Sequence, residues 1–280
     1  RVRRRGPRAR RVLAAAAVAA VLLGAWVWTR TLPVRAVEVV GYAHAHPDAL
    51  RTLAAVVPGE AALYALRPAE VAARVERHPW VARAAVSRYP TGRLRIRVEE
   101  REPVALVLAP DGRPGYYLDA AGYAMPTATA SGGSAFDVPL LRGAVPPYTE
   151  TGPVADGALR ALLAALAAAH PAEHALVSEV ELGPGGALTL YTTPAGAHGP
   201  IRVALSPTDL PDQLARLRAF FAQAVLPQPA RTFHLVDLRF SGQIVTREDG
   251  PERPFPAPSV PDSLRLRDAV EVAPDVPAAL

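Results

Sequence analysis

An uncharged apolar run near the amino end constrains this chain more than any other sequence feature. From Val12 to Trp28 the sequence reads VLAAAAVAAVLLGAWVW, seventeen residues without a charged side chain. As an α-helix, at about 1.5 Å per residue, this run is just long enough to cross the hydrocarbon core of a bilayer. Trp26 and Trp28 stand at its far end, where indole rings favour the boundary between lipid and water. The sequence therefore predicts a single transmembrane helix over residues 12–29.

The distribution of arginine predicts the orientation of this helix. Residues 1–11 hold seven Arg and no acid, whereas only Arg30 and Arg35 follow the run closely. Positive charge is retained on the cytoplasmic side, so we expect a cytoplasmic tail over residues 1–11 and the bulk of the chain outside the cytoplasmic (inner) membrane. A cleaved signal peptide is the alternative, with a small-residue site at residues 34–36. We favour a retained anchor because the run is longer than the usual signal core. The chain begins with Arg1 instead of Met, so we also expect further residues upstream.

Net charge argues against nucleic acid as a partner. The formal charge is +5, but the tail alone contributes seven positive charges, so the remaining chain carries −2. No basic surface is left to neutralise phosphates.

The absence of cysteine excludes disulfides, thiolate metal sites and a cysteine nucleophile. Half of the 280 residues are hydrophobic, which is enough for two modest folded domains.

Residues 34–102 have the pattern of a small α/β unit. A strand ends at Gly41, a helix opens at Pro47 and ends before Pro58-Gly59, and a second helix opens at Pro68. Two strands follow, over Val81–Tyr89 and over the alternating positions 94–98. In the first helix we expect one buried stripe, made of Leu50, Leu53, Ala54 and Val57. The predicted order is β-α-α-β-β.

Residues 103–248 predict a second α+β domain around a curved, mostly antiparallel sheet. Its elements, in chain order, are strands at Val104–Leu108, Tyr116–Leu118 and Val138–Leu141, a helix opening at Asp156, a hairpin around Gly183–Gly186, a strand at Ile201–Leu205, a helix from Leu210 to Phe221, and strands at Val236–Phe240 and Gln243–Glu248. A polar loop is expected at residues 127–134, and the Pro-rich residues 249–280 read as a flexible tail.

Four short motifs, in order, resemble one known family. They are HPWVARAAVSRYP at residues 78–90, LRIRVEEREPVA at 94–105, YLDAAG at 117–122, and VDLRF at 236–240. Together they are similar to the bacterial cell-division family called FtsQ or DivIB, over roughly residues 12–248. The resemblance implies a POTRA domain at 34–102 followed by an FtsQ-type β domain at 103–248.

The resemblance also implies a function. Members of the family are non-enzymatic divisome scaffolds at the division septum, where they link membrane proteins and help regulate septal peptidoglycan synthesis. The implied partners are the bitopic proteins of the FtsB/DivIC and FtsL type, with other divisome components through the POTRA domain. The implied partner-binding residues are Phe240, Ser241, Gln243, Val245 and Arg247. Phe240 stands where the family has Tyr, and core packing remains an equal alternative for it.

The sequence offers no catalytic, cofactor-binding or metal-binding constellation. Without Lys there is no phosphate loop, and no G-x-S-x-G elbow occurs. His44 and His46 are best interpreted as loop residues, and Pro171 argues against one helical face for His170 and His174. The Glu99, Glu100 and Glu102 run reads as a solvated strand edge, and Trp80 as a packing residue.

Two other function classes remain as alternatives. A POTRA-bearing chaperone or secretion component of the envelope would carry several such units or a following barrel, and neither pattern is visible. An envelope enzyme would need Asp, Glu or His residues that the sequence does not group.

Overall fold

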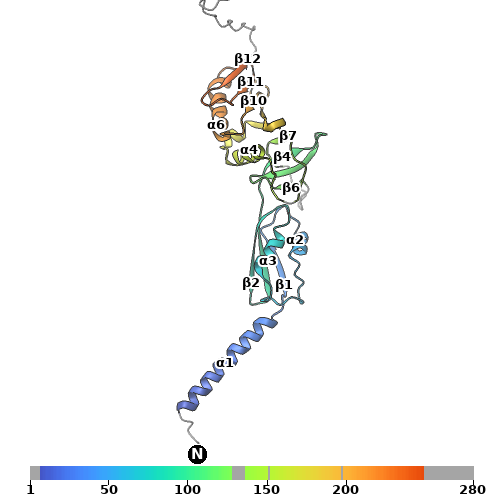
Figure 1. Cartoon of the computed structure of the whole chain (residues 1–280), viewed down its shortest axis with the longest axis vertical. Coiled ribbons are helices and arrows are strands. Elements are labelled where there is room, and N and C mark those ends of the chain that lie inside the picture. The colour runs from blue at the N-terminus through green and yellow to red at the C-terminus, as the bar shows by residue number, and fades with distance from the viewer. Residues whose placement is uncertain (1–6, 128–135, 151, 197, 249–280) are drawn as a thin grey trace, which may run out of the picture.

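The chain is an elongated molecule in which a single long helix precedes two folded domains (Figure 1). The computed structural model describes residues 7–127, 136–150, 152–196 and 198–248. The predicted tail at 249–280 and most of the predicted loop at 127–134 lie outside these residues.

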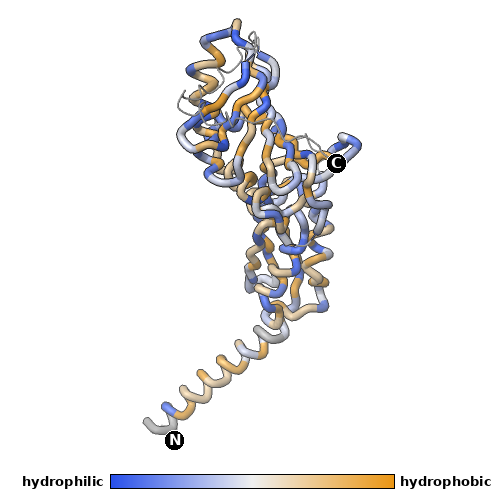
Figure 2. Tube along the Cα trace, turned by 45° about the horizontal axis from the view of Figure 1, so that its top comes forward, coloured by the Kyte–Doolittle hydropathy of each residue, from blue (hydrophilic) through white to orange (hydrophobic). Residues whose placement is uncertain are grey.

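Helix α1 covers Pro7–Thr31 and contacts neither domain along most of its length. Its window from Arg11 to Trp28 has a mean hydropathy of 1.9 and no buried residue, so it is long and apolar enough to cross a membrane. Figure 2 shows this helix as an almost uninterrupted apolar segment, in contrast to the alternating colours of the strands. A soluble protein could not leave such a surface in water without association.

The first domain has the predicted β-α-α-β-β order. Its three strands form a sheet in the order β1-β3-β2, with β1 parallel and β2 antiparallel to the central strand. The elements are β1 (Ala36–Val40), α2 (Pro47–Ala54), α3 (Pro68–Val75), β2 (Val81–Tyr89) and β3 (Arg93–Glu100).

Helix α2 is shorter than its apolar spacing predicts. His46 accepts the N–H of Asp48 at the amino end, and Pro47 occupies the first turn, where a missing N–H costs nothing. At the other end Ala55 turns the backbone left-handed, with φ of 52°. Leu50 and Ala54 are fully buried, but Val57 is 55% exposed, so its predicted place in the buried stripe is wrong. Periodicity alone could not show this stop because Ala55 carries no turn signal.

The second domain is built on one mixed, mostly antiparallel sheet of nine strands. Five neighbouring strand pairs are antiparallel and three are parallel. The spatial order is β12-β11-β10-β9-β8-β7-β4-β5-β6. The strands are β4 (Pro103–Leu108), β5 (Pro114–Asp119), β6 (Ala124–Pro126), β7 (Leu140–Gly143), β8 (Val177–Leu182), β9 (Leu188–Thr192), β10 (Arg202–Leu205), β11 (Phe233–Asp237) and β12 (Val245–Glu248). The sequence did not predict β6, which has only three residues.

Two longer helices contribute to the core of the second domain. Helix α4 (Gly157–Ala168) begins at Asp156, whose carboxylate accepts the N–H of Leu159, and its predicted leucine stripe is buried. The short α5 (Pro171–His174) follows, and then α6 (Leu210–Phe220), which continues as a π-helical turn at Phe221–Val225. The four predicted core positions of α6, from Leu210 to Phe221, are at most 3% exposed.

The two domains share packing residues where they meet. Phe136 of the second domain lies 4.9 Å from the ring of His44 and 5.8 Å from that of Trp80, centroid to centroid. Tyr117 completes the cluster, 5.2 Å from Phe136. Leu106 and Met125 of the second domain belong to the same buried cluster as the core of the first. A junction packed in this way resists bending because bending would expose apolar surface.

Candidate partner-binding site

The five residues implied as partner-binding lie on β12 and on the turn before it, at the far edge of the larger sheet (Figure 1). Val245 and Arg247 belong to β12, whereas Phe240, Ser241 and Gln243 lie in the connection from β11. The predicted strand through Phe240 is therefore wrong, because β11 ends at Asp237. The alternation of apolar residues continues past the strand end, since Leu238 is fully buried although it lies outside β11.

These positions are exposed. Phe240 is 53% exposed and Val245 48%, so neither is a core residue, and the core alternative for Phe240 is excluded. Ile244, which the sequence reasoning missed, is 37% exposed beside them. Ile244 could have been suspected from its place in the predicted last strand, but its exposure depends on where β11 ends.

Strand β12 is an edge of the sheet in the described part of the chain. Its register pairs Val245 with Asp237 and Thr246 with Val236. Directly paired residues share a face, so Thr246 lies on the side of the buried Val236, and Val245 lies on the opposite side. A strand with one neighbour leaves N–H and C=O groups along its other edge open to a further strand.

One arginine of α6 fixes the turn that presents Phe240. The guanidinium of Arg216 donates to the carbonyl oxygens of Phe240 and Gln243, both at 2.8 Å, and to that of Leu238 at 3.0 Å. Asp212, one helical turn earlier, accepts from its Nε at 2.8 Å and holds the side chain in place. The planar fork of a guanidinium suits several carbonyls at once. No sequence pattern indicates this role, because Arg216 has the spacing of an ordinary helix-surface residue.

A second ion pair stabilises the end of β11. Asp237 accepts from the Nε of Arg239 at 2.9 Å and from its backbone N–H at 3.1 Å. The hydrogen bond from the Arg239 side chain holds the pKa of Asp237 below its ordinary value, against the opposing effect of burial. The carboxylate is thus kept charged at the point where the chain leaves the strand, and it orients the residue before Phe240.

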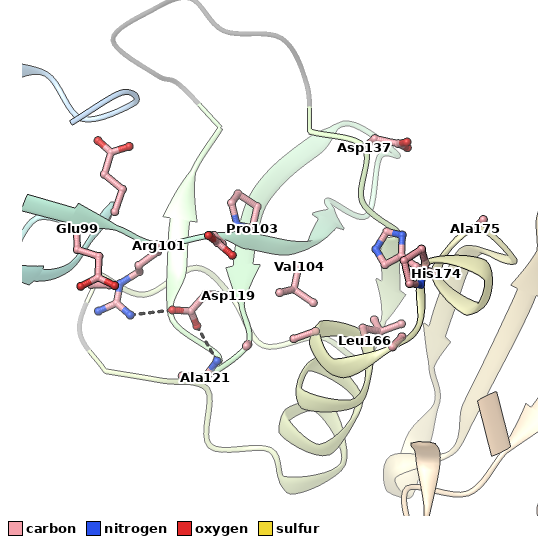
Figure 3. A pocket seen from close by; sticks show the side chains of 17 residues that line it. Glu99, Arg101, Pro103, Val104, Asp119, Ala121, Asp137, Leu166, His174 and Ala175 are labelled. Carbon is pink, nitrogen blue, oxygen red and sulfur yellow. Dashed lines mark hydrogen bonds and ion pairs between the residues drawn. The ribbon is translucent and has the colours of Figure 1, made fainter. Parts of the chain in front are cut away.

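A cavity of about 990 Å³ lies where the domains join, and its lining is mainly acidic and apolar (Figure 3). Two of its buried charges are paired with each other: Arg101 and Asp119 lie 2.7 Å apart, and Arg101 also stacks 3.8 Å from the centre of the Tyr123 ring. Figure 3 shows His174 well separated from the Arg101–Asp119 pair. Among the described residues no three His, Asp or Glu side chains could hold a metal ion. The described residues that line the cavity include no paired nucleophile and base.

The run of acidic residues predicted that Glu100 lies on a solvated strand edge, and this prediction is wrong. Its carboxylate accepts the backbone N–H groups of Ala43, His44 and Ala45 at 2.8–3.0 Å and lies 2.9 Å from the ring Nδ1 of His44. Burial alone would raise the pKa of Glu100, but these hydrogen bonds outweigh it and the pKa lies below its ordinary value. Trp80, as predicted, is a packing residue, and it is 1% exposed.

The fold and its edge site define a class: a protein with a long apolar amino-terminal helix, a small β-α-α-β-β domain, and a second domain that offers a strand edge. A family model described as "POTRA domain, FtsQ-type" matches residues 32–101. The Cell division protein FtsQ of Rhodothermus marinus is 49% identical over 225 residues, which cover 80% of this chain and 81% of that protein. The protein of the same name from Salinibacter ruber is 43% identical over 240 residues, 84% of this chain and 90% of that one.

The chain belongs to the FtsQ family of cell division proteins. A third relative of that name, from Anaeromyxobacter, is 30% identical over 225 residues. The family assignment supports a role in cell division, and the apolar α1 fits a membrane protein.

Proposed function

We propose that this protein is a non-enzymatic scaffold of the divisome, which joins other membrane division proteins at the septum and helps regulate septal peptidoglycan synthesis. In this proposal residues 1–11 are cytoplasmic, 12–29 cross the inner membrane once, and 34–102 and 103–248 are the POTRA and β domains outside the cytoplasm. The excess of arginine in residues 1–11 supports this topology.

One observation carries the proposal: apolar side chains gather on an open strand edge. Phe240, Ile244 and Val245 are all exposed within six residues of sequence, on β12 and its turn. Single exposed apolar residues are normal on a protein surface, but a group of three beside unpaired backbone groups is typical of a binding edge.

Strand addition is the recognition mode that fits this edge. A partner strand would pair with the outer side of β12 through backbone hydrogen bonds, and Val245 and Arg247 would contact its side chains on one face. Phe240, Ser241 and Gln243 would contact the partner at the adjoining turn. We propose bitopic proteins of the FtsB/DivIC and FtsL type as these partners, and further divisome components as partners of the POTRA domain.

Copurification of the detergent-solubilised full chain with these partners tests the proposal. We expect Phe240→Ala and Val245→Glu each to reduce partner recovery about five- to thirtyfold, because loss of a central apolar contact costs about 1–2 kcal/mol. Tyr148→Ala and Leu226→Glu are matched controls, since Tyr148 is 39% and Leu226 58% exposed elsewhere in the same domain.

Unchanged recovery with both β12-edge variants would place the interface elsewhere, even though the family is established. A fluorescent fusion addresses the scaffold role separately. Even distribution around the envelope in dividing cells, while other division proteins mark the septum, would contradict it.

A further inference from the structure

The chain passes from α1 into the first domain without a linker. The N–H of Leu32 donates to the carbonyl of Trp28 at 3.0 Å, which continues the helical hydrogen bonding by one residue. Leu32 is only 6% exposed and Val34 is fully buried, and both belong to the core of the first domain. The end of the helix is therefore fixed to the domain within one or two residues.

Residues 32–35, which lead from the helix into β1, are hydrogen-bonded to one segment on each side. The N–H of Leu63 donates to the carbonyl of Leu32, and the N–H of Val34 to that of Ala61, both at 2.8 Å. On the opposite side the N–H of Arg35 donates to the carbonyl of Gly92 at 2.7 Å. We call residues 32–35, 57–63 and 88–93 together the membrane-proximal tip.

The depth of the membrane-proximal tip follows from the helix. Leu32 lies four residues beyond Trp28, or about 6 Å along the helix axis. The polar layer on each side of a bilayer is about 5–8 Å thick. With Trp28 at the edge of the hydrocarbon, the segments hydrogen-bonded to residues 32–35 lie at the level of the lipid headgroups.

The charges of the membrane-proximal tip are mostly positive. It contains Arg35, Arg88, Arg93 and one acid, Glu60, all of them exposed, for a net charge of +2. In the described part of the chain neither Arg35 nor Arg88 has an ion pair. Arg93 lies 3.8 Å from the carboxylate of Glu38, which is shared with a second arginine at 3.3 Å.

Apolar and aromatic groups stand among these arginines. Val57 is 55% exposed and Tyr89 38% exposed, and Pro58 and Pro90 are exposed next to them. A tyrosine beside arginines suits an interface where one end of the ring is in lipid and the other is hydrated. Exposure of the apolar Val57 side chain to water is unfavourable, whereas contact with lipid would remove this cost.

We propose that the membrane-proximal tip binds the headgroups of anionic phospholipids in the outer leaflet of the membrane that α1 crosses. Arg35 and Arg93 pair with lipid phosphates, and Tyr89 and Val57 rest at the edge of the acyl region. The bilayer is thereby contacted at a second place besides α1. Because the two domains share packing residues, this contact fixes the direction in which the whole molecule points from the membrane. The inference does not depend on the proposed partner site.

The chain has no cysteine, so single labels can be placed without background. We would label Thr91→Cys, in the tip, and Ala222→Cys, at the far end, in the full chain with a fluorophore. Each protein would be reconstituted into nanodiscs of phosphatidylcholine alone or with about 30 mol % phosphatidylglycerol. Quenching by lipids that carry a spin label on the headgroup reports the approach of the fluorophore to the surface.

We expect phosphatidylglycerol to raise the quenching at position 91 by about twofold or more and to leave position 222 unchanged. About 1 M NaCl, where the Debye length is about 3 Å, should abolish the increase. Replacing Arg35 and Arg93 together with Gln should also abolish it. The matched control replaces Arg77 and Arg83 with Gln, since both are exposed in the same domain near the start of β2, which is the end away from the tip.

Equal quenching at position 91 in both kinds of nanodisc would overturn the proposal, and so would an increase that persists at high salt. These two arms need no arginine substitution, so they remain decisive if the double variant fails to fold. An increase retained by the double Arg35 and Arg93 variant, with unfolding temperature unchanged, would overturn the assignment of these residues.

Discussion

Arg216→Ala should loosen the turn between β11 and β12 while leaving the rest of the second domain folded. The side chain of Arg216 is 18% exposed and donates to three backbone carbonyls, which belong to Leu238, Phe240 and Gln243. No other side chain in the described residues is shown bonding to these three carbonyls. Alanine would leave the carbonyls of Leu238 and Gln243 to water or without a partner, and that of Phe240 with only the backbone N–H of Gln243, 3.4 Å away.

The magnitude follows from the exposure of the three carbonyls. A hydrogen bond from a charged donor contributes about 1.5–3 kcal/mol when its acceptor is otherwise unpaired. Phe240 and Gln243 are exposed, so water can replace most of what their carbonyls lose, whereas Leu238 is fully buried. The pair with Asp212, which is 64% exposed, adds about 0–1 kcal/mol. We expect the free energy of local opening to fall by about 2–4 kcal/mol.

Amide hydrogen exchange over residues 238–248 measures this opening directly. At about 1.4 kcal/mol per tenfold change, exchange there should accelerate about 30- to 700-fold in Arg216→Ala. Arg216→Lys should behave in the same way, because an ammonium group cannot reach three carbonyls with the geometry of the fork. Arg218→Ala is the matched control, since its side chain is 48% exposed and pairs with Glu173 instead.

Exchange in Arg216→Ala within about twofold of the wild type at these amides would refute the reasoning. It would mean that the pairing of β12 with β11, and not the arginine, holds the turn. A uniform acceleration throughout the second domain would refute it too, because the effect would then be on global stability.

The remaining predictions concern the first domain. The lowered pKa of Glu100 stabilises the fold above the ordinary carboxyl pKa, and this stability is lost as the pH falls through the lower folded value. Glu100→Gln should therefore cost about 1–3 kcal/mol near neutral pH and flatten the acid limb of a stability-versus-pH curve from urea melts, and parallel curves would contradict this. Gly41→Ala and Gly59→Ala are matched, with φ of 87° and 91°, but only the first places a Cβ against the Val98 carbonyl. Thermal unfolding should show Gly41→Ala at least about 2 kcal/mol less stable than Gly59→Ala, and equal losses would refute the clash. Trp80→Ala should cost about 3–5 kcal/mol in denaturant unfolding, and a loss below about 1 kcal/mol would show that the cluster collapses around the gap.

Local patterns predicted the elements well where the physics is local. Proline occupies the first turn of α2, α3 and α6, where its fixed φ suits a helix start. The leucine stripe of α4 is buried, as its helical spacing predicts. The alternation of Leu94, Ile96 and Val98 correctly predicted a strand, which lies at the centre of the first sheet, and all three are at most 3% exposed.

The errors arose where distant residues decide the outcome. Glu100 accepts N–H groups from residues 55–57 positions earlier, so its neighbours Glu99 and Glu102 say nothing about its environment. Phe240 continues a two-residue alternation, yet the turn after Asp237 is set by Arg216, 24 positions away. Neither contact leaves a trace in periodicity, because the partner residues are unremarkable in their own segments.

The position of β12 depends on contacts that lie far from it. Its edge is one end of the nine-stranded sheet, while the other end, through β4, β5 and the residues after β6, packs against the first domain. The cluster of Phe136, His44, Trp80 and Tyr117 therefore joins the sheet to a domain that is itself fixed to α1 through Leu32 and Val34. A continuous series of buried contacts runs from the end of the helix to the sheet. Substitutions in the junction can therefore change the position of the β12 edge without contacting any partner. The effect of a junction variant on binding should be compared with its effect on stability before it is assigned to an interface.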